Sequence, residues 1–303
     1  RETDTLDTFM CSNWYLFRYT SPNYTEGPFD PEKLKDWCPI DLYTGGVEHA
    51  TMHLLYVRFF TKALRDVGLL NFDEPFLKLF NQGTIILDKQ KMSKSKGNVV
   101  NPDDYVAKSG ADAIRAYLMF IGPWEQGGEW NDNGLTGITR WINRIWNLVL
   151  ATEQGNSTDV DSKQIQHMTH KTIKRVSNCL ENFRFNTMLS ALMEFTNYLS
   201  TVKESNKVDG NGAWKEAIDS LLLMLAPSIP HLAEEFWEVT GHAYSIHNKL
   251  FPAWSEDYVT EEEFTLVIQI NGKVRGKVLC PVSITEEGAR ELAFAQENIE
   301  ARL

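Results

Sequence analysis

Apolar residues recur at helical spacing through the middle of the chain. In residues 142–149, 185–199 and 214–225, apolar side chains fall three or four positions apart. Several amphipathic helices in series predict a bundle, and their aromatic side chains, Trp146 among them, are expected in its core. The longest apolar block, Leu221 to Ala226, is far shorter than the roughly 20 residues that a membrane helix needs.

The two ends of the chain have different patterns. Residues 1–120 mix short strands, glycine turns and helices, which indicates an α/β layer arrangement, whereas residues 121–258 form the helical region. An acidic linker, Ser255–Glu263, leads into residues 263–303, which read as strand, hairpin, strand and helix. Asn271-Gly272 is the hairpin signal, because both residues tolerate positive φ. The return strand is expected to have Val274 and Val278 on one face and, on the other, Lys273, Arg275 and Lys277.

Composition narrows the classes of protein to consider. The net charge of −11 is not typical of a free nucleic-acid binder, although a local basic patch could still act as one. The chain begins with Arg1, which indicates a processed or excised piece, and it has no signal-peptide pattern. Reduced, buried thiols in the cytoplasm are expected, without a zinc site or disulfide, for the four scattered cysteines, Cys11, Cys38, Cys179 and Cys280.

A lysine-rich loop carries the sharpest chemical signal. The string Lys91-Met92-Ser93-Lys94-Ser95 lies between a strand-like segment, Thr84–Leu87, and a helix start where Asn101 can cap and Pro102 fits the first turn. Lysines on such a loop can reach the phosphates of a nucleotide. From residue types alone, an ordinary basic surface loop explains it equally well.

Three further segments could line a binding site. Gly45 and Gly46 permit a tight turn close to a ligand, and Glu48, at an expected helix start, could accept two hydrogen bonds from a ribose diol. An apolar ligand could also be bound by the aromatic block around Phe9, although such a block is usually core. The segment Gln82-Gly83-Thr84-Ile85 is a weak strand signal.

These strings resemble one family. Lys91–Ser95 is the signature of class I aminoacyl-tRNA synthetases, and residues 45–56 resemble the corresponding segment of leucyl-tRNA synthetases of bacterial type, unlike the isoleucyl and valyl enzymes. The resemblance covers nearly the whole chain. It implies an α/β second half of a Rossmann-like catalytic fold, then an α-helical anticodon-binding-type bundle and a small α+β carboxy-terminal domain.

The resemblance also implies roles for individual residues. Lys91 and Lys94 would be catalytic and stabilise charge on the ATP phosphates. The ATP and adenosine site would comprise Gly45, Gly46, Glu48, Gln82, Thr84, Ile85, Met92, Ser93 and Ser95. The leucine pocket would comprise Phe9, Ser12, Tyr15 and His49, with the role of His53 left open. The tRNA phosphates would be met by Lys273, Arg275 and Lys277, which could instead merely keep an edge strand soluble.

The same resemblance sets expectations about partners. The substrates would be leucine, ATP with Mg²⁺ as its counter-ion, and tRNA(Leu), with no protein-bound metal and no membrane. No His-x-Gly-His motif or editing domain is present, and the carboxy-terminal domain is cut short at Leu303. We therefore expect poor leucine activation without the missing amino-terminal half. The alternatives are a subunit of a split synthetase, a non-catalytic tRNA-binding module, or an unrelated α/β-plus-helical protein.

Overall fold

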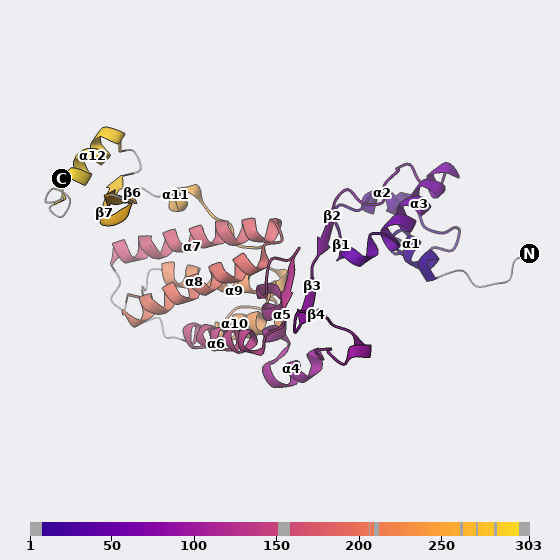
Figure 1. The fold of residues 1–303 in the computed structure, drawn as a ribbon, viewed down its shortest axis with the longest axis horizontal. Helices are drawn as coiled ribbons and strands as arrows, with labels where there is room; N and C mark the ends of the chain where they lie inside the picture. The colour runs from indigo at the N-terminus through magenta and orange to yellow at the C-terminus, as the bar shows by residue number, and fades with distance from the viewer. Residues whose placement is uncertain are drawn as a thin grey trace, which may run out of the picture. The chain divides into compact units, whose positions relative to one another are not determined.

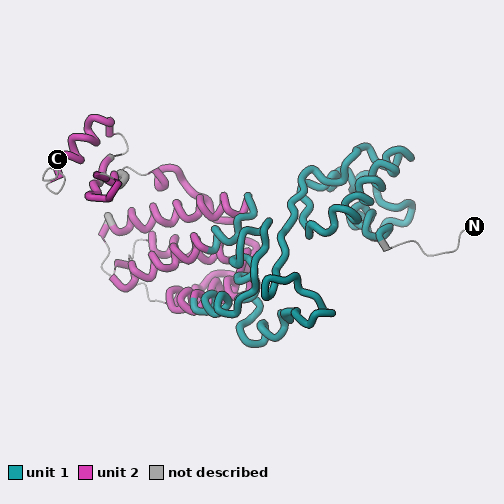
Figure 2. The backbone as a smooth tube through the Cα atoms, in the orientation of Figure 1, with its two compact units in different colours: residues 1–140, 182–189 teal, residues 141–181, 190–303 magenta. Residues whose placement is uncertain are grey.

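The structure is a computed structural model in which the chain forms two compact units (Figure 1). Unit 1 comprises residues 1–140 and 182–189, and unit 2 comprises residues 141–181 and 190–303 (Figure 2). The structure describes residues 8–150, 158–205, 207–208, 212–260, 263–270, 272–281 and 284–296. Part of the amino-terminal block, Asn271 of the hairpin signal and residues 297–303 thus lie outside the described residues.

Unit 1 opens with helices packed on a small apolar core. α1 (Thr8–Arg18) packs against α3 (His53–Asp66), and α2 (Pro31–Trp37) begins where Asp30 accepts a hydrogen bond from the Glu32 amide. Their core consists of Leu16, Phe17, Phe29, Leu34, Val57 and Leu70. Cys11 is exposed rather than buried as expected, because it lies on the side of α1 away from these residues.

Two small sheets belong to unit 1. β1 (Tyr43–Gly46) pairs in parallel with β2 (Leu79–Gln82), so that Gly45 lies opposite Asn81 and Gly46 opposite Gln82. The second sheet has the order β4-β3-β5, with β5 parallel to β3. Its strands are β3 (Thr84–Leu87), β4 (Gln90–Lys91) and β5 (Gly127–Glu129). Two helices, α4 (Pro102–Ser109) and α5 (Ala111–Phe120), lie between β4 and β5 in the sequence.

Two strand predictions need correction. The segment from Gln82 to Ile85 is not one strand, because Gly83 separates the end of β2 from the start of β3. β5 lies inside the region predicted to be helical. It is three residues long and contains two glycines, so it has no apolar alternation by which a strand is recognised.

Glycine is required where these strands meet. The Gly83 amide donates to the Trp124 carbonyl oxygen at 2.8 Å, and a Cβ on Gly83 would lie 2.0 Å from the Gly127 nitrogen. Gly127 has φ +73°, and a Cβ there would lie 2.2 Å from the Thr84 carbonyl oxygen. Only a residue without a side chain allows this backbone approach.

Unit 2 is a helical bundle. The apolar residues predicted in its clearest stripe, from Trp214 to Leu225, are buried, and Trp141 donates to the Thr196 hydroxyl at 3.2 Å inside the core. Trp146 differs from the expectation, since 37% of it is exposed and its ring only partly packs on Phe236. Unit 2 contains parts of α6 (Asp132–Val149) and α8 (Phe185–Glu204), together with α7 (Asp159–Glu181), α9 (Ala213–Leu225) and α10 (Pro230–Val239).

The carboxy-terminal hairpin has the predicted pairing but not the predicted faces. β7 has one extra residue opposite the step from Ile268 to Gln269 of β6, and this bulge shifts the register. Val274 therefore lies opposite Gln269, while Val278 lies opposite Leu266. The extra residue in β7 reverses the alternation, and the two valines therefore lie on opposite faces. Lys273 and Lys277 are likewise separated, opposite Ile270 and Val267. The elements are α11 (Glu256–Val259), β6 (Glu263–Ile270), β7 (Lys273–Pro281) and α12 (Glu286–Phe294).

Within the described ranges, none of the helices combines the length and the apolar composition that crossing a bilayer takes.

The glycine contact gives a first prediction. Gly127→Ala is expected to lower the free energy of unfolding by at least about 2 kcal/mol, because it adds both steric overlap and positive-φ strain. Gly137→Ala, in α6 with open space around its Cβ, is the control and should stabilise the helix by up to about 1 kcal/mol. Urea unfolding followed by tryptophan fluorescence measures both; equal effects would contradict the steric account.

Candidate functional site

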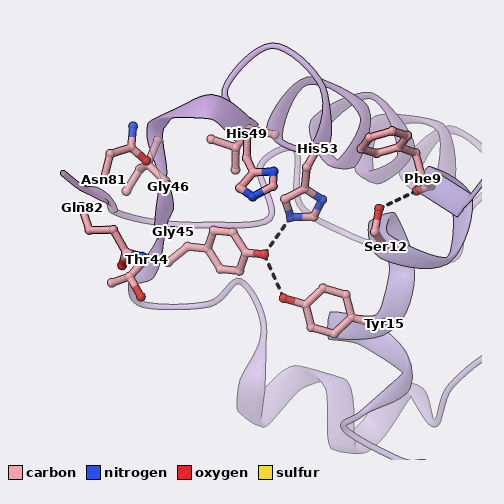
Figure 3. Close-up of a pocket in the computed structure, with 13 residues that line it drawn as sticks. Phe9, Ser12, Tyr15, Thr44, Gly45, Gly46, His49, His53, Asn81 and Gln82 are labelled. Carbon is pink, nitrogen blue, oxygen red and sulfur yellow. Dashed lines mark hydrogen bonds between the residues drawn. The ribbon is translucent and has the colours of Figure 1, made fainter. Parts of the chain in front are cut away.

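A cavity of about 450 Å³ lies along the parallel strands β1 and β2, which supply residues from their first to their last positions (Figure 3). α1 and the start of α3 supply the remaining walls. The lining residues are Phe9, Ser12, Tyr15, Tyr43, Thr44, Gly45, Gly46, His49, His53, Leu54, Leu79, Asn81 and Gln82.

The cavity brings together every residue that the sequence suggested for a leucine pocket. Phe9, Ser12 and Tyr15 come from successive turns of α1, and His49 comes from the 3-10 turn after β1. Phe9 stacks on Tyr56 of α3 with ring centres 5.9 Å apart, which fixes its ring at the wall. Three residues expected in the nucleotide site line the same cavity: Gly45, Gly46 and Gln82.

A hydrogen-bonded chain that the sequence did not reveal lies in the cavity wall. The Tyr43 hydroxyl is 2.9 Å from the Tyr15 hydroxyl and 2.7 Å from Nε2 of His53 (Figure 3). Tyr43 also stacks on Phe76, with centroids 4.0 Å apart. The family resemblance left the role of His53 open, and nothing in the sequence pointed to Tyr43.

Two members of this chain, Tyr43 and His53, are held in the neutral form. Burial raises the pKa of the Tyr43 phenol above its ordinary range, and the hydrogen bond with Tyr15 raises it further. Burial, followed by the charge of His49, lowers the pKa of His53 below its ordinary 6.5. The Nδ1 atom of His53 is buried without a hydrogen-bond partner among the described residues. Tyr43 and His53 are therefore uncharged near pH 7, and His53 retains one unused polar atom.

Glu48 does not begin a helix as expected. It lies in a 3-10 turn, Val47–His49, and α3 starts only at His53, after the irregular backbone of Met52. Glu48 is exposed, and its carboxylate folds over Gly46 so closely that a Cβ on Gly46 would lie 2.2 Å from Oε2. This carboxylate is the far end of a flexible, exposed side chain, so it can move away from Gly46.

Residues expected to meet adenine line neighbouring cavities. Gln82 and Thr84 line one of about 500 Å³, and Gln82 and Ile85 line one of about 150 Å³. The backbone of Thr84 and Ile85 pairs with Gly127 and Gly128 of β5. β4 pairs only with Ile86 and Leu87, so the opposite edge of β3 is not covered by β4 at Thr84 and Ile85.

The lysine loop is held by one side chain that the sequence did not single out. The Ser93 amide donates to Oδ1 of Asn98 at 2.9 Å, and Nδ2 of Asn98 donates to the Lys91 carbonyl oxygen at 3.3 Å. These bonds fix the backbone on both sides of Met92, which is half-buried. Gly97 closes the 3-10 turn Lys94–Lys96 with φ +69°, a conformation that favours glycine.

The lysines themselves project from this fixed backbone. Lys91 pairs with Ile86 as part of β4, and Lys94 begins the 3-10 turn; both side chains are exposed. The hydroxyls of Ser93 and Ser95 share a hydrogen bond of 2.8 Å. The helix start after the loop is confirmed, since Asn101 accepts a hydrogen bond from the Asp103 amide.

The remaining predicted residues lie in unit 2. The side chains of Lys273, Arg275 and Lys277 are exposed on β7. No group of three or more histidine, cysteine or acidic side chains in the described ranges is arranged to hold a metal ion.

Two protein-family models match the chain. One described as "tRNA synthetases class I (I, L, M and V)" matches residues 1–129, and one described as "Anticodon-binding domain of tRNA ligase" matches residues 162–289. Proteins named "Leucine--tRNA ligase" from Dehalococcoides mccartyi and Rubrobacter xylanophilus are 54% and 53% identical over 100% of this chain. The chain belongs to the leucine–tRNA ligase family. It spans 37% of the length of these relatives.

Solved structures agree with this family. The LeuRS of Agrobacterium radiobacter K84, in a complex titled LeuRS-tRNA-LeuAMS, matches 100% of this chain and 40% of its own with a TM-score of 0.85 and 33% identity. Mycobacterium tuberculosis methionyl-tRNA synthetase matches 74% of this chain and 48% of its own with a TM-score of 0.56. At 20% identity the latter shows only the fold. The expected fold class, a part of the class I catalytic fold followed by a helical anticodon-binding domain, is confirmed.

The lowered pKa of His53 predicts a pH effect on stability. Below about pH 6.5 the unfolded chain takes up a proton at residue 53 before the folded chain does, so the free energy of unfolding falls as pH falls. His53→Gln should reduce this dependence, and His231→Gln, at an exposed position, serves as the control. Urea unfolding from about pH 7.5 to about pH 5 measures it. The same pH dependence in wild type and His53→Gln would rule this out.

Proposed function

We propose that this chain provides part of the leucine-activating site and part of the tRNA(Leu)-binding surface of a leucine–tRNA ligase. One observation carries the proposal. Phe9, Ser12, Tyr15 and His49 line one cavity beside two parallel strands, in a chain 54% identical along its whole length to proteins named Leucine--tRNA ligase. The substrates are leucine, ATP and tRNA(Leu).

The 450 Å³ cavity is the leucine pocket in this proposal. Aromatic rings provide rigid apolar area for an isobutyl group. Phe9 and Tyr15 contribute such area, and the neutral Tyr43–His53 chain adds polar atoms without a net charge. A wall of this kind favours an uncharged side chain over a charged one, because an ion there would lose hydration without gaining a partner.

The nucleotide lies beside this pocket, toward β3 and the lysine loop. Glu48 accepts the ribose hydroxyls, and the glycines at 45 and 46 let the backbone approach. Gln82, Thr84 and Ile85 meet the adenine, and the loop from Lys91 to Ser95 meets the phosphates. Mg²⁺ accompanies ATP and is held by phosphate oxygens, which are ligands that it prefers.

The chemistry has two steps. The leucine carboxylate attacks the α-phosphorus of ATP, forms leucyl-adenylate and expels pyrophosphate, whose developing charge Lys91 and Lys94 stabilise. A hydroxyl of the terminal tRNA ribose then attacks the leucyl carbonyl carbon, and AMP leaves. Because Asn98 fixes the loop backbone in advance, the lysines need less reorganisation at the moment of reaction.

A further part of the ligase completes the site. Helix α3 exposes an apolar stripe at helical spacing, with Met52, Leu55 and Phe59 between 46% and 70% exposed. An unpaired strand edge can accept a further strand, and among the described residues β1 and β2 pair only with each other. We assign these surfaces to the missing amino-terminal half, which supplies the other phosphate-binding motif.

In this proposal each of three regions of the chain has its own role. Residues 1–120 serve catalysis, residues 121–258 form the anticodon-binding-type bundle, and residues 263–303 contact the tRNA through Lys273, Arg275 and Lys277. The reaction supplies protein synthesis, so the protein works in the cytoplasm.

Leucine-dependent exchange of pyrophosphate into ATP tests the catalytic part. The chain mixed with a separately produced amino-terminal half should be active, and either piece alone should not. Lys94→Ala should lower the exchange rate by roughly 100-fold or more, since a preorganised charge-stabilising group is lost. Lys108→Ala, an exposed lysine on α4, is the control. Absence of exchange in a folded, associated mixture would favour a non-catalytic tRNA-binding module.

A further inference from the structure

Three side chains on α7 hold the segment that leads into the carboxy-terminal hairpin. Nδ1 of His167 lies 2.6 Å from the Tyr258 carbonyl oxygen. The Lys174 ammonium donates to Glu256 at 2.9 Å and lies 4.4 Å from the centre of the Trp254 ring. With His170 they occupy positions three or four apart, on one side of the helix. The sequence predicted only an acidic linker here.

His170 is the centre of this contact. Its side chain is 8% exposed, and its ring stacks on Tyr258 with centroids 4.6 Å apart. The Ser255 amide donates to Nδ1 at 3.1 Å, and Nε2 lies 3.1 Å from Oε1 of Glu216 on α9. Because Nδ1 accepts a hydrogen bond, the proton of the neutral ring is on Nε2, which donates to Glu216. One ring therefore joins α7, α9 and the segment 254–258.

The hairpin begins a short distance along the chain from this contact. Five residue steps separate Tyr258 from Glu263, the first residue of β6, and five extended residues span at most about 18 Å. Where α7 holds Tyr258 therefore limits where β6 and its partner β7 can be. Without the contact, the hairpin would sample a larger volume, and its effective concentration at any surface bound by the bundle would fall.

We propose that His170 is a positioning residue for tRNA binding. By fixing the segment 254–258 to α7, it keeps the basic strand β7 within reach of the phosphates of a tRNA that the bundle holds. The inference rests on the proposed function, because it needs the cations of β7 to contact tRNA. It adds a role for a buried side chain that lies outside the leucine and nucleotide sites.

Two substitutions separate the bonds of His170. His170→Asn keeps an acceptor near the position of Nδ1 for the Ser255 amide and loses the donor to Glu216. His170→Gln keeps a donor near the position of Nε2 and gives up the acceptor for Ser255. Tyr258→Leu removes the stacking partner at a residue that is 39% exposed, so this variant should fold.

The readout is binding of a fluorescently labelled tRNA(Leu) transcript to the 303-residue chain, by anisotropy over a range of salt concentrations. We expect His170→Gln and Tyr258→Leu to weaken binding by at least about fivefold, the size of a modest coupling between sites. His170→Asn also loses the stacking ring but keeps the bond to Ser255, so it should weaken binding less than His170→Gln does. Thermal unfolding by circular dichroism verifies that each variant is folded.

The triple variant Lys273→Ala/Arg275→Ala/Lys277→Ala decides how His170 acts. It should weaken binding and flatten the dependence of log affinity on log salt by about 2 to 3. In this background His170→Gln should have no further effect, because the contact it positions is gone.

Different results would contradict the proposed tRNA contact and the positioning role of His170. If the triple variant binds like wild type, or the wild-type chain does not bind, the proposed tRNA contact is wrong and the inference falls with it. If the triple variant binds weakly but His170→Gln and Tyr258→Leu do not, only the positioning role is wrong. It is also wrong if His170→Gln weakens binding equally in both backgrounds, since the effect then does not pass through β7.

Discussion

The close backbone approach of Gly83 to Gly127 is the constraint on which the rest of unit 1 depends. β2 ends at Gln82 in the cavity wall, and β3 begins at Thr84 and leads through β4 into the lysine loop. A single residue therefore connects the strand that shapes the cavity to the strand that carries the loop. Because neither glycine tolerates a Cβ, the spacing between β5 and the start of β3 is set by backbone contact and cannot relax around a side chain.

The proposed site has uncharged polar side chains on the β2 side of Gly83 and positively charged side chains on the β3 side. On the β2 side, Tyr43 and His53 are neutral and hydrogen-bonded to each other, which suits an uncharged amino-acid side chain. On the β3 side, Lys91 and Lys94 remain exposed on a backbone that Asn98 fixes, which suits phosphate. Burial controls the first and local hydrogen bonding the second. In unit 2, α7 likewise fixes the backbone of the segment before β6, and exposed cations lie on β7.

Local signals predicted local structure well. The cap at Asn101, the buried stripe of α9 and the hairpin pairing of β6 with β7 all follow from residues close in sequence. The features that the sequence did not predict depend on contacts between residues far apart in the chain. β5 forms because Gly127 can approach Thr84. The bulge in β7 reverses side-chain faces without altering composition, and the Tyr15–Tyr43–His53 chain joins α1, β1 and α3. The spacing of apolar residues along the chain carries no information about such contacts.

The most direct test is equilibrium binding of a non-hydrolysable leucyl-adenylate analogue to the chain assembled with its amino-terminal half. The account predicts that Phe9→Ala weakens binding by roughly tenfold or more, about 1.4 kcal/mol. Lys94→Ala should have little effect, because the analogue lacks the pyrophosphate that the lysine meets. An isoleucyl analogue should bind more weakly than the leucyl one. Equal affinity for both analogues, unchanged by Phe9→Ala, would contradict the assignment of the cavity to leucine.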